Sequence, residues 1–356
     1  MEPSRERIVE ALGGVIDPEL RRPVTELDMV RSVDVDGGHV TVTIALTVAG
    51  CPLRSSFEQQ VGDVLRDVPG VTSVSLGFDV MSPDERQALT TKLRGGFSAR
   101  SQGLSLDAST RVIAVCSGKG GVGKSTLAAN LAVAFSQLGL RAGILDADVY
   151  GHSIPHILGI RQKPVLVDRM IVPPVKGDLK LMSIGFFLDD NQPVMWRGPM
   201  LHRALEQFLS DVHWGELDVL VVDMPPGTGD VAISLGQLLP RAEAIVVTTP
   251  QPAAQEVAAR AGAMAQKTSM RLVGVIENMS GAVFGSGGGE ALAQELEIPF
   301  LGSIPLDPQL REAGDAGEPF LVADPVADSA EAIRSIAARV VELQAGMIRK
   351  PLPLVS

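Results

Sequence analysis

The sequence predicts an α/β protein in two parts: a small α+β domain, then a larger, doubly wound domain with a mostly parallel sheet. Its 356 residues are enough for about two domains. Near the N-terminus apolar and polar residues alternate, which is typical of strands with one face in water. From residue 111 onward, short continuous apolar runs are separated by helical stretches. Such runs are typical of strands that helices cover on both faces.

The small domain is expected over residues 1–95. A hairpin is predicted at Gly37-Gly38, because the segments on either side alternate between apolar and polar residues. Ser82 and Glu85 have the spacing of a capping box, which predicts that a helix begins there. The elements expected in this domain are a helix over 5–12, strands over 30–36 and 39–46, a helix near 57–68, a strand over 71–80 and a helix that ends near residue 94.

Residues 96–109 are expected to be a linker, because they are rich in Gly, Ser and Ala and show no periodicity. The larger domain then covers 110–346. A closing helix is expected over 329–344, and residues 347–356 are expected to be a flexible tail. The apolar runs that predict the parallel strands are Val112 to Cys116, Ala142 to Leu145, Leu217 to Val222, Ala244 to Thr248 and Leu272 to Ile276.

Composition excludes several classes of protein. Hydrophobic residues make up 45% and charged residues 21%, as in ordinary globular proteins, which excludes a disordered or fibrous chain. The formal charge of −11 repels phosphate backbones and anionic lipid, so neither nucleic acid nor membrane is expected as a partner. Two cysteines allow no disulfide framework, and no apolar stretch reaches the roughly 18 residues of a membrane span. A cytoplasmic location is therefore expected.

A phosphate-binding loop follows the first strand of the larger domain. The run from Ser117 to Thr126 has the spacing GxxxxGK[ST] and opens a predicted helix. Its backbone N–H groups and the helix N-terminus suit a polyphosphate, Lys124 suits the β and γ oxygens, and the Ser125 hydroxyl suits Mg²⁺. The larger domain is therefore expected to be a P-loop NTPase domain. The expected nucleotide-binding residues of the loop are Gly118, Lys119, Gly120, Gly121, Val122, Gly123, Lys124, Ser125 and Thr126.

Two acidic elements end later apolar runs, where open α/β sheets place their ligands. In the first, Asp148 is expected to orient and polarise the attacking water, and Asp146 to support the loop or the water shell of the metal. In the second, Asp223 is expected to contact Mg²⁺ as a Walker B carboxylate. Gly227 follows in a Pro-Pro-Gly-Thr-Gly segment, and its backbone N–H is expected to respond to a γ-phosphate. Strand-end aspartates that only cap helices are the alternative.

The P-loop resembles the deviant Walker A motif of the MinD/ParA/Mrp class of ATPases, because it carries a second lysine, Lys119. In that class the signature lysine reaches the nucleotide of a second subunit. The resemblance therefore implies a homodimer with ATP between the subunits and a catalytic role for Lys119 with Lys124 and Asp148. It also implies that Asn278 contacts adenine, with the loop of residues 304–308 closing the pocket.

Five segments, in order, resemble the Mrp (ApbC-like) iron-sulfur carrier ATPases over about residues 108–345. They begin at Asp146, Trp196, Asp223, Glu277 and Phe284. The front domain has Asp-Pro-Glu from residue 17 and Gly-Cys-Pro from residue 50, and resembles the iron-sulfur assembly domain of the SufT/PaaD type. The resemblance implies ATP, Mg²⁺ and an iron-sulfur cluster as cofactors, with apo iron-sulfur proteins and cluster assembly factors as partners.

The cysteines depart from this pattern. Family members carry Cys-x-x-Cys after the Asn-Met-Ser segment, but residues 280–284 read Ser-Gly-Ala-Val-Phe. Cys116 lies in the strand that enters the P-loop, where a buried structural thiol is expected. Cys51 precedes a predicted helix whose dipole lowers a thiol pKa, so it is the expected cluster ligand, with a core cysteine as the alternative. His152 and His156 have the i, i+4 spacing of a helical metal site, but two residues make a weak pattern, so a structural role is expected.

The sequence therefore predicts an ATP-hydrolysing carrier that binds iron-sulfur clusters and transfers them to apoproteins. Because Cys-x-x-Cys is missing, an ATPase assembly or regulatory factor that holds no cluster itself stays open. A spatial organiser of the MinD or ParA kind is disfavoured by the net charge of −11. A reductase like the nitrogenase iron protein is disfavoured because it needs two cluster cysteines in each ATPase domain.

Overall fold

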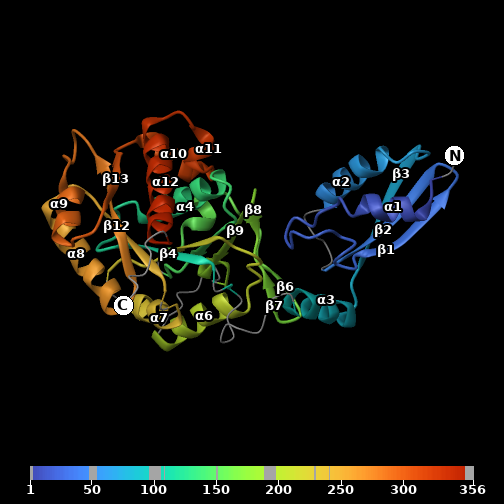
Figure 1. Ribbon diagram of the computed structural model, residues 1–356, viewed down its shortest axis with the longest axis horizontal. Coiled ribbons are helices and arrows are strands. Elements are labelled where there is room, and N and C mark those ends of the chain that lie inside the picture. Colours follow the sequence, from blue (N-terminus) through green and yellow to red (C-terminus); the bar gives the residue numbers. More distant parts are fainter. Residues whose placement is uncertain are drawn as a thin grey trace, which may run out of the picture. The chain divides into compact units, whose positions relative to one another are not determined.

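The structure, a computed structural model, describes residues 3–47, 54–95, 106–107, 109–149, 151–187, 198–227, 230–239 and 241–348. The chain divides into two compact units (Figure 1). Unit 1 comprises residues 1–105, 164–173 and 211–215, and unit 2 comprises the rest. Cys51, Tyr150, Trp196 and Arg197 are outside the described residues.

Unit 1 is a three-stranded sheet with helices. Strands β1 and β2 pair antiparallel and β2 and β3 pair parallel, in the order β1-β2-β3. The expected capping box forms: the Ser82 N–H donates to Glu85 Oε2 at 2.6 Å, and the Glu85 N–H donates to Ser82 Oγ at 3.2 Å. The elements are α1 (Arg5–Leu12), β1 (Val30–Asp36), β2 (His39–Leu46), α2 (Arg54–Arg66), β3 (Ser73–Val80), α3 (Pro83–Gly95), β6 (Val165–Val167) and β7 (Met170–Val172).

The hairpin β6–β7 joins unit 1 although it lies within the range expected for the larger domain, and the sequence analysis does not foresee it. Val167 and Met170 are buried in the same apolar cluster as Ile8 and Phe57. The Thr90 hydroxyl of α3 donates to the Val167 carbonyl at 3.4 Å. Burial of these side chains is what attaches the hairpin to the unit.

Unit 2 is a doubly wound α/β unit around a sheet whose described strands run β13-β12-β11-β4-β10-β5-β9-β8. All neighbours pair parallel except β8 and β9, which are antiparallel. Its strands are β4 (Arg111–Ser117), β5 (Ala142–Asp146), β8 (Val175–Lys176), β9 (Leu179–Ser183), β10 (Val219–Asp223), β11 (Glu243–Thr248), β12 (Arg271–Ser280) and β13 (Phe300–Pro305). Strands β4, β5, β10 and β11 are buried throughout, as their apolar runs predict.

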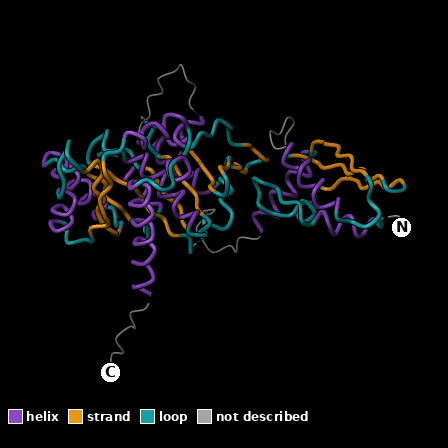
Figure 2. Tube along the Cα trace, turned by 90° about the horizontal axis from the view of Figure 1, so that it is seen from above, coloured by secondary structure: helices purple, strands orange, loops and turns teal. Residues whose placement is uncertain are grey.

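Helices cover both faces of this sheet. Figure 1 shows α4 and α12 on one side and α6 and α7 on the other, and Figure 2 shows the same unit from above. The helices of unit 2 are α4 (Lys124–Gln137), α5 (Ile154–Ile157), the 3-10 helix η1 (Ile184–Phe187), α6 (Gly198–Ser210), α7 (Asp230–Leu238), α8 (Pro252–Lys267), α9 (Gly288–Glu295), α10 (Pro308–Ala316), α11 (Phe320–Ala323) and α12 (Asp328–Ile348).

The last helix is longer than predicted. It was expected to end at 344, but α12 runs to Ile348 and so enters the segment expected to be a flexible tail. Its buried side chains Ile333, Ile336 and Val340 belong to the apolar core of unit 2, so this face of the helix is a packing face.

Candidate functional site

The P-loop joins β4 to α4 at the carboxyl end of the central strands. Strand β4 is buried over its whole length and ends at Ser117, and α4 begins at Lys124. The connecting turn carries the predicted residues from Gly118 to Gly123, and the other three lie in the first turn of α4. Val122 is buried, whereas Lys119, Gly120 and Gly121 are exposed. The strand-turn-helix context that a phosphate-binding loop requires is therefore present.

Gly123 and Asn278 pack closely against each other at the start of α4. Gly123 has φ +82°, and a Cβ there would lie 2.3 Å from Asn278 Nδ2, so only glycine fits. The Asn278 amide donates to the Val122 carbonyl at 2.8 Å, and its Oδ1 is buried without a hydrogen-bond partner. That oxygen is free to accept a hydrogen bond from a ligand.

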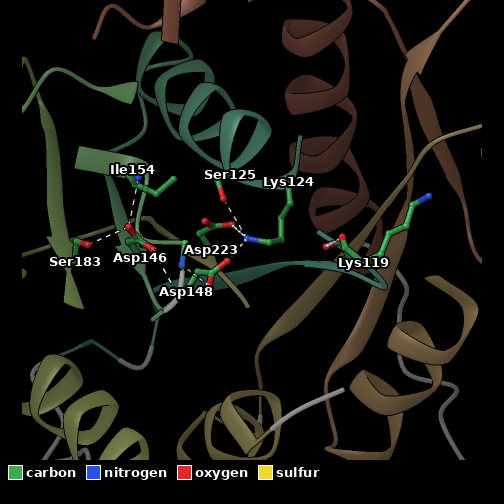
Figure 3. Close-up of polar contacts among 10 residues, drawn as sticks. Lys119, Lys124, Ser125, Asp146, Asp148, Ile154, Ser183 and Asp223 are labelled. Atoms are coloured by element: carbon green, nitrogen blue, oxygen red, sulfur yellow. Dashed lines mark hydrogen bonds and ion pairs between the residues drawn. The ribbon is translucent and has the colours of Figure 1, made fainter. Parts of the chain in front are cut away.

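Lys124 is the centre of the polar cluster in Figure 3. Its Nζ lies 2.6 Å from Asp223 Oδ1, 3.5 Å from Asp148 Oδ2 and 3.2 Å from Ser125 Oγ. Strands β4, β10 and β5 lie next to one another, so their carboxyl ends bring the P-loop, Asp223 and Asp148 together. The structure thus assembles four of the predicted site residues in one buried place.

Asp146 supports the loop that carries Asp148, as the sequence predicts. Its Oδ1 accepts from the Asp148 N–H at 3.2 Å, and its Oδ2 accepts from the Ile154 N–H at 3.3 Å and from the Ser183 hydroxyl at 2.9 Å. Burial raises the pKa of Asp146 to about 8, and the neighbouring charge of Asp223 adds to the effect. Sequence reasoning misses Ser183, because the short strand β9 carries a lysine among its apolar residues and gives no strand signal.

The cluster fits a divalent cation. Burial raises the pKa of Asp223, and the Lys124 ammonium beside it opposes this shift. Asp223 Oδ2 is buried without a hydrogen-bond partner, so it has a lone pair for a ligand. Among the described residues, no three His, Cys, Asp or Glu side chains form a cage for a metal. One or two carboxylates and a hydroxyl are what Mg²⁺ needs when phosphates and waters supply its other ligands.

Lys119 lies apart from the polar cluster around Lys124, and Gly227 contacts the start of the P-loop. Figure 3 shows the Lys119 side chain directed away from the carboxylates, and its carbonyl accepts from the Ser117 hydroxyl at 3.1 Å. The Gly227 N–H donates to the Ser117 carbonyl at 2.8 Å, which ties the segment after Asp223 to the start of the P-loop. Within its own subunit Lys119 therefore makes no contact with the polar side chains around Lys124.

A cavity of about 550 Å³ begins at the P-loop and Asn278. Its wall includes Gly123, Thr126, Asn278 and residues 305–308 of the 304–308 loop that is expected to close the pocket. Ile157 and Leu310 add apolar surface. An aromatic base suits such a mixed wall, with the unpaired Asn278 oxygen as acceptor.

The described cysteine is not a metal ligand. Cys116 is buried in β4, and burial raises the pKa of its thiol to about 12, so it stays protonated. The segment that replaces Cys-x-x-Cys is a tight turn in which Gly281 and Gly285 exchange backbone hydrogen bonds of 2.8 and 2.7 Å. His152 and His156 are exposed. Cys51, the predicted cluster ligand, lies outside the described residues.

Glu277 has a structural role that the sequence analysis does not foresee. It is buried at the end of β12, and its carboxylate accepts from the Gly287 N–H at 3.2 Å and from the Gly289 N–H at 2.7 Å. These N–H groups are at the start of α9, where a helix needs acceptors. The sequence does carry a signal for this role: an acidic residue stands about ten positions before a glycine-rich turn and a helix.

None of the helices in the described part of the chain combines the length and the hydrophobicity that a membrane crossing requires.

Comparisons with known proteins identify the family of this chain. The family of NUBPL iron-transfer P-loop NTPases matches residues 108–341, and a family of iron-sulfur cluster assembly proteins matches residues 5–76. An iron-sulfur cluster carrier protein of Mycobacterium leprae is 53% identical over 331 residues, which are 88% of this chain and 86% of that protein. One of Bacillus subtilis is 42% identical over 85% of this chain and 88% of that protein.

Solved structures share the fold of unit 2. A nucleotide-binding protein of Archaeoglobus fulgidus in complex with ADP is 37% identical, with a TM-score of 0.52 over 59% of this chain and 87% of its own. The cell division ATPase MinD of Pyrococcus furiosus shares the fold, with 22% identity and a TM-score of 0.52 over 65% of this chain and 99% of its own. The chain therefore belongs to the iron-sulfur cluster carrier family of P-loop NTPases.

Proposed function

We propose that this protein hydrolyses ATP and uses the cycle to bind iron-sulfur clusters and transfer them to apoproteins. The observation that carries the proposal is the buried contact of Lys124 with Asp223 and Asp148, in a chain that matches carrier proteins over most of its length. Apo iron-sulfur proteins and cluster assembly factors are the proposed partners. The resemblance of the P-loop supports a homodimer as the working form.

The residues divide the chemistry of hydrolysis among them. Lys124 and the loop N–H groups hold the phosphates, and Asn278 accepts from the base. Asp223 and Ser125 would hold Mg²⁺, which neutralises charge on the phosphates when it is bound. When phosphate oxygens bind the Lys124 ammonium, they replace Asp148 as its partner. The Asp148 carboxylate can then orient the attacking water. The Lys119 side chain is directed away from the carboxylates of its own subunit, so it is available to the nucleotide of a second subunit.

The cargo site is proposed at Cys51. Iron-sulfur clusters take about four ligands, mostly thiolates, and a dimer supplies two copies of Cys51. The remaining ligands would come from small thiols, a partner protein or histidines. Cys116 is excluded from this role because its thiol is buried and stays protonated.

A second candidate function is an ATPase assembly factor that holds no cluster itself. The turn at residues 281–285 favours it, because that turn contains no cysteine where family members carry two. In this case the front domain would act through protein partners.

The test is anaerobic cluster transfer to an apo acceptor protein, with ATP hydrolysis followed in the same samples. The native protein should hydrolyse ATP and accelerate transfer, and Lys124→Ala should lose at least about 100-fold in hydrolysis because the phosphates lose their cation. The control Lys267→Ala removes an exposed lysine at the end of α8 and should behave as native. Transfer that proceeds equally fast without the protein would exclude the carrier function, and native-like hydrolysis by Lys124→Ala would exclude the assigned ATPase site.

A further inference from the structure

Unit 2 contains a second cavity, of about 690 Å³, which the proposed ATPase cycle does not use. It borders α5 and the end of α10, and His156 and Asp315 line both this cavity and the one beside Asn278. The two cavities are therefore neighbours with a shared wall. The P-loop residues do not line the second cavity, so its ligand would differ from the phosphates of ATP.

The polar side chains that line this cavity are mostly basic, although the chain as a whole is acidic. His152, His156, Arg161 and Lys163 line it, and all four are exposed. Asp315 is its one acidic lining residue, and Arg311 Nη1 already pairs with that carboxylate at 2.6 Å. Within the described part of the chain, none of the four basic side chains forms a hydrogen bond or ion pair. On a protein with a net charge of −11, Arg161 and Lys163 are therefore two cations that no ion pair neutralises.

Close backbone contacts hold the walls of the cavity in place. Gly159 and Gly317 both have positive φ, and a Cβ on Gly159 would lie 2.2 Å from the Gly317 carbonyl oxygen, so the ends of α5 and α10 touch. A Cβ on Gly185 would lie 2.4 Å from His152 Cδ2, so the imidazole ring packs on the bare backbone of η1. The ring that lines the cavity is therefore positioned before any ligand arrives.

We propose that this cavity binds a small dianion that carries carboxylate or phosphate groups. The Arg161 guanidinium supplies a planar fork for two oxygens, and the Lys163 ammonium supplies a second positive charge. The imidazoles of His152 and His156 supply further donors. The volume exceeds that of a single phosphate and suits a small organic anion.

The experiment is calorimetric titration of inorganic phosphate and, separately, of succinate into the full-length protein saturated with Mg·ADP, so that the P-loop is occupied. We expect at least one of the two to bind with millimolar or tighter affinity. Tighter binding of phosphate assigns a phosphorylated ligand, and tighter binding of succinate assigns a carboxylate. The double variant Arg161→Gln, Lys163→Gln should weaken binding at least about tenfold, because it removes two charge-assisted contacts.

The matched control is Arg260→Gln, Lys267→Gln, which removes the same charge from the exposed surface of α8 and should keep the native affinity. Native ADP affinity and thermal midpoint show that the cavity variant is folded. The proposal is overturned if neither anion binds, or if the cavity variant binds as tightly as the control. Neither result depends on hydrolysis or on a cluster, so it leaves the proposed function to its own test.

Discussion

Lys124 shows how one buried charge organises the site. An ammonium with 6% exposure is stable only with partners, and Asp223 and Asp148 provide them at 2.6 and 3.5 Å. Two carboxylates around one ammonium leave negative charge in excess. That excess favours a divalent cation in the same place. The motif spacing in the sequence predicts each of these residues, because glycine-rich loops and strand-end aspartates recur wherever phosphates are bound.

Asp148→Asn should separate ATP binding from hydrolysis. The amide oxygen of asparagine can still accept from the Gly151 N–H, as Asp148 Oδ1 does at 3.1 Å, but it cannot polarise water as a carboxylate does. We expect hydrolysis to fall by about 10²- to 10⁴-fold while ATP affinity stays within a few-fold of native. Single-turnover hydrolysis and equilibrium nucleotide binding measure the two quantities. Native turnover by this variant would remove Asp148 from the chemistry.

Glu19 should make the stability of unit 1 depend on pH. Burial raises its pKa from 4.5 to about 7, and the charge of Asp17 adds to the shift. Between these two values the folded state binds more protons than the unfolded state, so the free energy of unfolding should fall as pH rises. We expect a loss on the order of 2 kcal/mol between about pH 5 and pH 8.

The measurement is denaturant unfolding across this pH range for the native protein and Glu19→Gln. The variant stays neutral, so its free energy of unfolding should be flatter with pH. Equal slopes for both proteins would show that Glu19 is not the titrating group.

The sequence predicts the regular elements of the fold but not the short ones. Helix α1 and strands β1 and β2 have the predicted bounds, because their periodicity is regular and the hairpin glycines mark the turn. Hairpin β6–β7 and strand β9 are not predicted, because they are short and their burial comes from distant segments. Ser183 is missed for the same reason. Its contact with Asp146 joins residues that are 37 positions apart in the chain.

Glu277 should matter for the stability of α9 and of the turn before it. Glu277→Ala leaves the Gly287 and Gly289 N–H groups without their acceptor, and we expect a loss of about 2 kcal/mol in the free energy of unfolding. The control Glu290→Ala removes an exposed carboxylate from the first turn of the same helix and should cost less than about 0.5 kcal/mol. Chemical denaturation of both variants decides this, and equal losses would contradict the capping role of Glu277.

The chain as a whole joins two units, and each resembles a separate family. Residues 5–76 match an iron-sulfur cluster assembly family, and residues 108–341 match iron-transfer P-loop NTPases. The order of buried apolar runs predicts the doubly wound unit, because strands covered on both faces read as continuous hydrophobic segments. The association of residues 164–173 and 211–215 with unit 1 is a long-range contact, which no local pattern encodes.

Lys119 should control assembly. We expect ATP with Mg²⁺ to shift the native protein toward a dimer in sedimentation velocity, and Lys119→Ala to stay monomeric at the same concentrations. The reason is that the exposed Lys119 ammonium makes no contact with the carboxylates around Lys124, so it is available to the nucleotide of a partner subunit. Lys267→Ala is the control and should dimerise as native. A Lys119→Ala protein that dimerises and hydrolyses ATP normally would contradict the shared-site arrangement.

Cluster binding is tested most directly by anaerobic reconstitution with iron and sulfide, followed by iron and sulfide counts and an absorption spectrum. The comparison is between the native protein, Cys51→Ala and the control Cys116→Ala, which alters only the buried thiol. We predict a stable chromophore in the native protein and in Cys116→Ala, and its loss in Cys51→Ala. If none of the three proteins binds iron and sulfide, the carrier account is contradicted, and the chain acts as an ATPase assembly factor through its partners.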